Sequence, residues 1–267
     1  MQTLVLMRYS YFGMSGWRSR ASRDVDQLLS SDRLAQRIRL FENLALRSLA
    51  DQTDDDFKLI VLSSAAMPKW RRRQLTSLCK DTLGDARADV IFRRPGTVHR
   101  MFKTHIQKIY GDAPVTCQVV LDDDDAFSSD FIEHLKPEAD AAFQTRPDTK
   151  HRSFLSFPEG LTLKLGDDKP QIFTRDVPFT NLGFSLVAPT SEKYTVFGLA
   201  HKKVKRRHPA RVIYRNAPMY VRTVHDSNDS RALFTEDPVQ DRDMPEILTR
   251  FPCLGTYFSD KVTTKAA

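Results

Sequence analysis

Short apolar runs alternate with helical patterns along the first 140 residues, and this alternation restricts the fold more than any other feature. The apolar runs are residues 3–7, 57–63, 90–92 and 115–121. Apolar residues recur at helical spacing over residues 34–49, after Pro68, and over residues 98–110. Because parallel strands need a crossover between them, this order predicts an α/β fold in which helices flank a mainly parallel sheet.

The length of 267 residues is that of one large α/β domain. Hydrophobic residues make up 40% of the chain, so it can bury a sizeable core. After about residue 150 the pattern changes to strand pieces, turns and prolines. We therefore expect a single domain, residues 1–267, with a regular half, residues 1–150, and a less regular half, residues 151–267.

The formal net charge of +7 favours anionic partners. The densest basic segment of the chain is residues 201–208, His-Lys-Lys-Val-Lys-Arg-Arg-His. These charges suit an anionic acceptor, a membrane surface or nucleic acid, and equally a solvated face. No recognised nucleic-acid-binding motif accompanies the segment, so we expect no specific nucleic-acid partner.

The cysteines and the N-terminus indicate the cellular compartment. Cys79, Cys117 and Cys253 are widely spaced and odd in number, which favours a reducing cytoplasm over a disulfide framework. Residues 1–14 are typical of a first strand rather than a signal peptide, and no run approaches the ~20 apolar residues that cross a bilayer. We expect a cytoplasmic protein, with peripheral binding to the inner membrane face as one use of residues 201–208.

Four aspartates, Asp122 to Asp125, follow the apolar run 117–121 without a break. Carboxylates this close repel one another and raise each other's pKa unless a cation or hydrogen-bond donors compensate. Mg²⁺ and Mn²⁺ accept carboxylate oxygens and complete their shells with water and substrate phosphates. At the carboxyl end of a strand, where open α/β sheets bind ligands, the run indicates a cation and phosphate site. The alternative is a solvated acidic loop before the next helix.

Residues 119–126, Val-Val-Leu-Asp-Asp-Asp-Asp-Ala, resemble the DxD motif of GT-A glycosyltransferases. Together with Arg-Leu-Phe-Glu-Asn (39–43), Ser-Leu-Ala-Asp-Gln-Thr (48–53) and Asp-Phe-Lys-Leu-Ile-Val-Leu (56–62), they resemble a bacterial family described as "putative rhamnosyltransferases". The resemblance covers residues 1–140 well, and His-Asp-Ser-Asn (225–228) is its main support beyond them. It implies a Rossmann-like, GT-A-type sheet, a divalent cation, and sugar transfer from a nucleotide-diphosphate donor. The regular half would bind the donor, and the other half would face the acceptor.

The resemblance also assigns metal ligands. Asp122 and Asp124 match the outer aspartates of the motif, of which the first contacts donor ribose or metal and the second coordinates the cation. With four aspartates in a row the register stays open by one residue, so Asp123 is included as a donor contact and Asp125 as a metal ligand. His225 is expected as a late metal ligand because imidazole suits Mn²⁺; a hydrogen-bonded loop histidine is the alternative.

Donor contacts are expected at the ends of the other strands. Arg8 follows the first strand, where donor contacts usually lie. Ser63 ends the second strand, where related enzymes often carry an aspartate for the base. Arg93, Arg100 and Lys103 flank the third strand and the next helix, close in topology to the diphosphate, which the arginine fork suits.

An inverting transfer, which the rhamnosyl analogy favours, needs a carboxylate that takes the acceptor's proton. Asp176 and Glu192 are the candidates for this base, and the sequence does not rank them. The leading hypothesis is a metal-dependent glycosyltransferase with a glycan or lipid-linked acceptor, in polysaccharide biosynthesis. The alternatives are another metal-dependent enzyme acting on phosphates, such as a nucleotidyltransferase or nuclease, and a non-catalytic basic binding protein.

Overall fold

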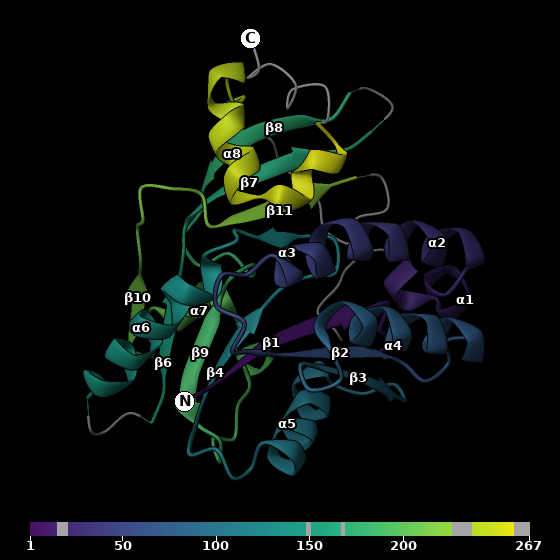
Figure 1. Ribbon diagram of the computed structural model, residues 1–267. Coiled ribbons are helices and arrows are strands. Elements are labelled where there is room, and N and C mark those ends of the chain that lie inside the picture. The colour runs from purple at the N-terminus through teal and green to yellow at the C-terminus, as the bar shows by residue number, and fades with distance from the viewer. Residues whose placement is uncertain (15–20, 148–150, 167–168, 226–236, 259–267) are drawn as a thin grey trace.

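A seven-stranded sheet forms the centre of the molecule, in the strand order β10-β6-β9-β4-β1-β2-β3 (Figure 1). The computed structural model describes residues 1–14, 21–147, 151–166, 169–225 and 237–258. The strands of this main sheet are β1 (Gln2–Tyr9), β2 (Lys58–Ser64), β3 (Ala88–Arg93), β4 (Val115–Val120), β6 (Ser153–Ser156), β9 (Ser185–Pro189) and β10 (Ala210–Val212). Strands β3, β2, β1 and β4 pair in parallel, and β9 runs antiparallel between β4 and β6. The predicted α/β fold with a mainly parallel sheet is confirmed.

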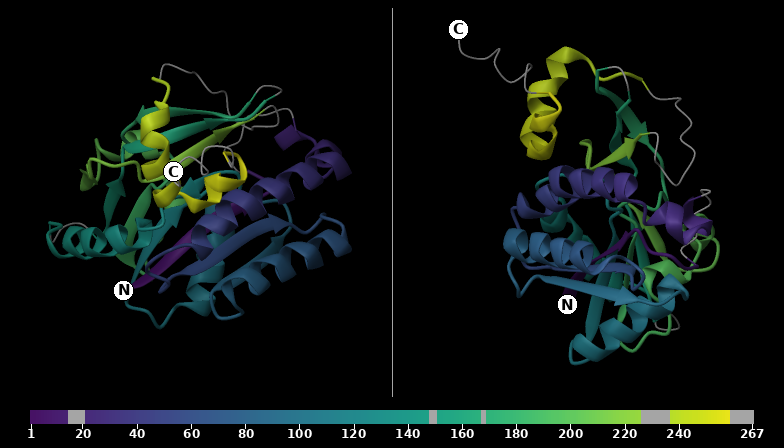
Figure 2. Two further views of the ribbon diagram at one scale, coloured as in Figure 1. Left: turned by 45° about the horizontal axis from the view of Figure 1, so that its top comes forward. Right: turned by 90° about the vertical axis from the view of Figure 1, so that its right-hand side faces the viewer.

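Helices cover both faces of the main sheet and one side of a second, smaller sheet. They are α1 (Val25–Leu28), α2 (Ser31–Leu40), α3 (Arg47–Ala50), α4 (Lys69–Leu83), α5 (Val98–Ile109), α6 (Phe131–Gln144), α7 (His201–Val204) and α8 (Met244–Arg250). A π-helical stretch, η2 (Phe41–Leu46), joins α2 to α3 into one continuous rod. Figure 2 shows α2 and α4 on one face of the sheet and α5 on the other. Among the described residues, no helix has the length and apolar character that a membrane span needs.

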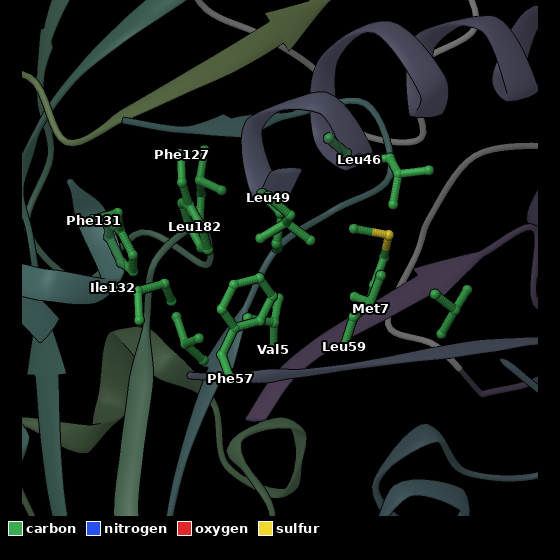
Figure 3. Packing of buried hydrophobic residues seen from close by; sticks show 14 of the residues in the cluster. Val5, Met7, Leu46, Leu49, Phe57, Leu59, Phe127, Phe131, Ile132 and Leu182 are labelled. Atoms are coloured by element: carbon green, nitrogen blue, oxygen red, sulfur yellow. The ribbon is translucent and has the colours of Figure 1, made fainter. Parts of the chain in front are cut away.

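Alternating side chains of the strands fill the two cores. On β1, Val5 and Met7 pack with the rod and α4, whereas Leu4 and Leu6 pack with α5. Figure 3 shows the first of these cores, in which Val5 lies near Leu49 of the rod. This period of two follows from the pleat of a strand, and it decides which face each polar residue at a strand end will reach.

A second, smaller sheet lies beyond the rod, at the top of Figure 1. Its strands are β5 (Ala126–Phe127), β11 (Tyr220–Val224), β7 (Glu159–Lys164) and β8 (Gln171–Asp176), in that order. Helix α8 covers it with Met244, Ile247 and Phe251. Because β4 ends at Val120 and β5 begins at Ala126, the aspartate run is the connection between the two sheets.

Candidate active site

The aspartate run makes a turn at the carboxyl edge of the main sheet. In β4, Cys117 and Val119 face the rod, and Val120 faces α5. The same alternation, continued past the strand, turns Asp122 toward α5 and Asp123 toward the rod. The backbone N–H of Asp125 donates to the carbonyl of Asp122 at 3.2 Å, which closes the turn.

Arg8 and Asn181 hold Asp122 on the α5 side. Nη2 of Arg8 donates to Oδ1 of Asp122 at 2.7 Å, and Nδ2 of Asn181 donates to Oδ2 at 3.3 Å. The Asp122 side chain is 25% exposed, and the Arg8 guanidinium lies over the ring of Phe197. Arg8, predicted as a donor contact, therefore reaches the aspartate run. Asn181 was not predicted, because nothing in its spacing marks it.

Arg37 of α2 holds the next two aspartates from the opposite face. Its Nε donates to Oδ2 of Asp123 at 3.1 Å, and its Nη2 pairs with the other Asp123 oxygen. Its Nη1 donates to Oδ2 of Asp124 at 3.0 Å. All three side chains are buried. Sequence reasoning missed Arg37, although it falls on the apolar stripe that includes Leu34 and Ile38, where a charge signals a buried partner.

His225 reaches the same turn from the end of β11. Its Nε2 lies 3.0 Å from Oδ2 of Asp124, so the histidine lies beside the aspartate run, as predicted. Asp125 has a different partner, because its Oδ1 accepts the backbone N–H of Thr223 at 2.8 Å. Residues 226–228 of the His-Asp-Ser-Asn motif lie outside the described residues.

Burial and neighbouring charges shift the carboxyl pKa values in opposite directions. Burial raises the pKa of Asp123 to about 7, although Arg37 opposes the rise. Burial, and then the charges of Asp124 and Asp122, raise the pKa of Asp125 well above its ordinary value. Burial also acts on Asp124, but Arg37 and His225 outweigh it and hold the pKa of Asp124 below its ordinary value. The turn therefore keeps a negative charge at Asp124.

These contacts decide which residues fit a divalent cation. Across the residues that the structure describes, no three His, Cys, Asp or Glu side chains are arranged to hold a metal ion. Asp124 and His225 are two residues of these types that lie in contact. Mg²⁺ commonly binds one or two carboxylates and takes its remaining oxygens from substrate phosphates and water. The pair fits a cation completed by a diphosphate. The contacts described for Asp122 and Asp125 are to Arg8, Asn181 and Thr223 instead.

The Ser-Leu-Ala-Asp-Gln-Thr motif fastens the segment after the turn. Ser48 accepts the backbone N–H of Phe127 at 3.2 Å. Gln52 donates to the carbonyl of Ser128 at 2.7 Å and accepts the N–H of Ile132 at 2.9 Å. The rod that carries Arg37 therefore also fixes the chain on the far side of the aspartates, which gives this motif a structural role.

The other predicted donor contacts lie along the carboxyl edge without touching the aspartates. Ser63 pairs with Tyr9 across β2 and β1, and its buried hydroxyl has no partner among the described residues. Arg93 ends β3, where its Nη1 donates to the carbonyl of Phe92 at 3.2 Å. Arg100 and Lys103 lie in the first turns of α5. Arg100 is exposed and Lys103 is half-buried.

The structure does not bring the two predicted bases to the aspartates. Val115 at the start of β4 pairs with Pro189 at the end of β9, so Glu192 lies at the amino edge, opposite Asp122. Glu192 is bound there to Arg152 at 3.0 Å. Asp176 ends β8, which is separated from β5 by two strands, about 14 Å at the usual spacing. Neither strand pairing could be read from the less regular half of the sequence.

Two cavities lie outside the aspartate turn. Asp176 lines one of about 400 Å³, between the second sheet and α8. The other, about 980 Å³, runs along α4 and includes none of the predicted site residues.

The basic segment lies against the loop that carries Asn181. His201, Val204 and His208 form its inner side: Nδ1 of His201 meets the carbonyl of Phe179, Val204 is buried, and His208 lies against Phe154. The exposed cations are Lys202, Lys203, Lys205, Arg206 and Arg207.

A mainly parallel sheet with helices on both faces and an acidic turn at its carboxyl edge is the arrangement of GT-A-type glycosyltransferases. The chain belongs to the family described as "Putative rhamnosyl transferase", whose sequence profile matches residues 2–237. The glycosyltransferase family predicted from the sequence is therefore confirmed. No curated protein matches the chain.

Solved structures of low identity are partly similar to the chain. S. aureus TarS 1-349 in complex with UDP is 10% identical with a TM-score of 0.42, over 84% of this chain and 61% of that chain. Mouse xyloside xylosyltransferase 1, in its apo form, is 10% identical with a TM-score of 0.37, over 79% and 84%. The inositol-1-phosphate CTP transferase from T. maritima is 13% identical with a TM-score of 0.31, over 87% and 92%. The chain thus spans less than two thirds of the TarS chain, and these likenesses carry no conclusion about substrates.

Proposed function

We propose that the protein transfers a sugar from a nucleoside-diphosphate donor to a hydroxyl group of a glycan or lipid-linked acceptor. A divalent cation, Mn²⁺ or Mg²⁺, would be held by Asp124 and His225. The observation that carries the proposal is the 3.0 Å meeting of these two residues, 101 positions apart in the chain, at the carboxyl edge of the sheet. Rhamnose is the sugar that the family description suggests. In this proposal residues 1–150 bind the donor and residues 151–267 face the acceptor.

Buried hydroxyl groups support a donor site at the ends of β1 and β2. Ser10 and Ser63 are buried, and neither hydroxyl has a partner among the described residues. Buried polar groups in proteins are nearly always satisfied, so a bound ligand or water is their expected partner. Ser10 also has a left-handed backbone, with φ at 42°, a conformation that is unusual outside glycine and enriched at functional sites. We assign the nucleoside to this place, beside Arg8.

The charges around the turn suit a leaving diphosphate. When bound, the cation acts as a Lewis acid that stabilises the charge of the leaving group. The part of this chain is to hold a carboxylate oxygen of Asp124 and an imidazole nitrogen of His225 in place. Arg93, Arg100 and Lys103 add positive charge along the same edge, where arginine can bind phosphate with two N–H groups.

The exposed cations of residues 202–207 give the acceptor side a basic border. They adjoin the loop that contacts Asp122 through Asn181. An anionic acceptor, or the inner face of a cytoplasmic membrane, suits such a border. This supports a peripheral position at that membrane during polysaccharide biosynthesis.

A thermal-shift screen tests the proposed function. UDP, dTDP, GDP and CDP, the matching nucleoside triphosphates and a polyanion would each be added with and without Mn²⁺. We expect one diphosphate to raise the unfolding temperature only when Mn²⁺ is present, because a ligand that binds the native state stabilises it. Stabilisation by nucleoside triphosphates alone would favour nucleotidyl transfer instead. Binding of polyanions without any nucleotide effect would favour a basic binding protein.

A further inference from the structure

Two guanidinium groups face four carboxylates in the aspartate turn. Arg8 contacts Asp122, whereas Arg37 directs two of its N–H groups to Asp123 and one to Asp124. A two-pronged arginine–carboxylate contact is strong and geometrically specific, and Asp123 is fully buried. Asp123 is therefore committed to Arg37, and it is poorly placed to exchange that partner for a cation.

Asp125 is also committed, though to the backbone. Its Oδ1 accepts the N–H of Thr223, a bond that ties the turn to β11 two residues before His225. A cation on Oδ1 of Asp125 would compete with this bond to β11.

Asp124 differs from both neighbours. Its Oδ2 takes a single N–H from Arg37 and lies 3.0 Å from His225. The Arg37 contact holds the carboxylate, and the His225 contact adds a nitrogen of the type that binds Mn²⁺. Asp124 therefore lies between the guanidinium of Arg37 and the imidazole of His225.

We infer that Arg37 determines which aspartate of the run can be a cation ligand. It occupies both carboxylate oxygens of Asp123, and it orients Asp124 toward His225. Asp124, rather than Asp123 or Asp125, is then the aspartate that binds the cation. The inference rests on the proposed function, since it concerns the cation proposed there. Arg37 acts through Asp124 and is a positioning residue.

The rod that carries Arg37 is also hydrogen-bonded to the chain after the aspartate turn. Ser48 of the same rod, and Gln52 two residues after the rod ends, accept the backbone N–H groups of Phe127 and Ile132. The rod thus contacts both the turn, through Arg37, and the chain after it, through Ser48, and a small displacement of the guanidinium would move Asp124. Partners that orient a metal ligand typically contribute 10–100-fold to metal affinity.

The test is an Mn²⁺ titration of the full chain, with free Mn²⁺ followed by electron paramagnetic resonance, alone and with UDP, dTDP, GDP or CDP. Arg37→Lys keeps the charge but loses the fork, and we expect it to weaken Mn²⁺ binding about 10-fold. The control is Arg250→Lys, because Arg250 forms an arginine–aspartate pair with Asp130 at 2.9 Å outside the turn, although that pair is less buried than the Arg37 pair. The control should keep wild-type Mn²⁺ affinity. Wild-type affinity in Arg37→Lys, or an equal loss in Arg250→Lys, would overturn the inference.

A second pair of variants tests the register even if Arg37→Lys fails to fold. Asp123→Asn should lower the metal-free unfolding temperature while losing less Mn²⁺ affinity than Asp124→Asn. An equal or larger loss in Asp123→Asn would overturn the inference. If the wild-type chain binds no Mn²⁺ with UDP, dTDP, GDP or CDP, the proposed function fails and the inference with it. If it does bind and the variants behave alike, the inference alone fails.

Discussion

Two arginines grip the aspartate turn from opposite faces of the main sheet, and they differ in what surrounds them. The Arg8 contact with Asp122 lies on the α5 side, where the Asp122 side chain is 25% exposed. The Arg37 contact with Asp123 lies on the rod side, where the Asp123 side chain is fully buried. A partly exposed carboxylate such as Asp122 keeps access to water, whereas breaking a fully buried pair leaves an uncompensated charge. The same two residue types therefore form a partly solvent-accessible contact on one face and a fully buried one on the other.

The largest expected effect concerns stability. Arg37→Ala should lower the free energy of unfolding by about 3–5 kcal/mol, because the buried carboxyl group of Asp123 loses its arginine partner. Arg8→Ala should lower it by only about 1–3 kcal/mol, since Asp122 keeps access to water and to Asn181. Urea denaturation followed by circular dichroism measures both. Equal losses in the two variants would contradict the proposed difference in stability contribution between the Arg37 and Arg8 contacts.

The next effect concerns ligand affinity. Asp124→Asn should weaken Mn²⁺-dependent binding of the preferred nucleoside diphosphate about 100-fold, or ~2.7 kcal/mol, because the amide loses the negative charge. Calorimetry with and without Mn²⁺ separates this loss from a general one. The control is Asp130→Asn, which removes the charged partner of Arg250 outside the turn. Unchanged affinity in Asp124→Asn would remove the cation site.

His225→Ala distinguishes a role of His225 in Mn²⁺ binding from a role in stabilising the fold. We expect about a 10-fold loss of Mn²⁺-dependent affinity, with a stability cost of about 1 kcal/mol for the lost hydrogen bond to Asp124. The same calorimetric and urea experiments measure the two quantities. Normal affinity with reduced stability would make His225 a structural partner of Asp124.

The smallest effect concerns stability at acid pH and the pair of Asp89 and His105, which lies outside the Arg8 and Arg37 contacts. A hydrogen bond from His105, and then one from Tyr110, lower the pKa of Asp89 below its ordinary value, against burial. A lowered carboxyl pKa adds stability above the unfolded-state value of about 4, and that stability is lost as the pH falls through the folded-state pKa. Asp89→Asn should therefore lower stability near pH 7 by less than about 1 kcal/mol and flatten its decline below pH 4. Urea midpoints from pH 2 to 7 test this, and an unchanged profile would contradict it.

The sequence was sufficient where local patterns decide the structure. Four continuous apolar runs became β1 to β4, and a run of carboxylates after the last of them had to lie at the carboxyl edge. The second half was different, because strand pairing there depends on distant partners. Glu192 follows an antiparallel strand and Asp176 ends an outer strand, and neither direction is encoded in the neighbouring residues. Arg37 could have been found, since a charge on an apolar stripe needs a buried counter-charge.

Strand β9 has a consequence for the order in which the chain can fold during synthesis. It lies between β4 and β6, yet it is made after both, and β6 reaches the main sheet only through it. Until residue 189 has left the ribosome, one edge of β4 keeps unpaired N–H and C=O groups, the kind of edge that recruits strands from other chains. Pairing over this sequence separation is slow because a long loop must close first. A nascent chain that pauses before β9 would therefore be the form most exposed to aggregation, and faster translation through residues 157–189 would shorten that exposure.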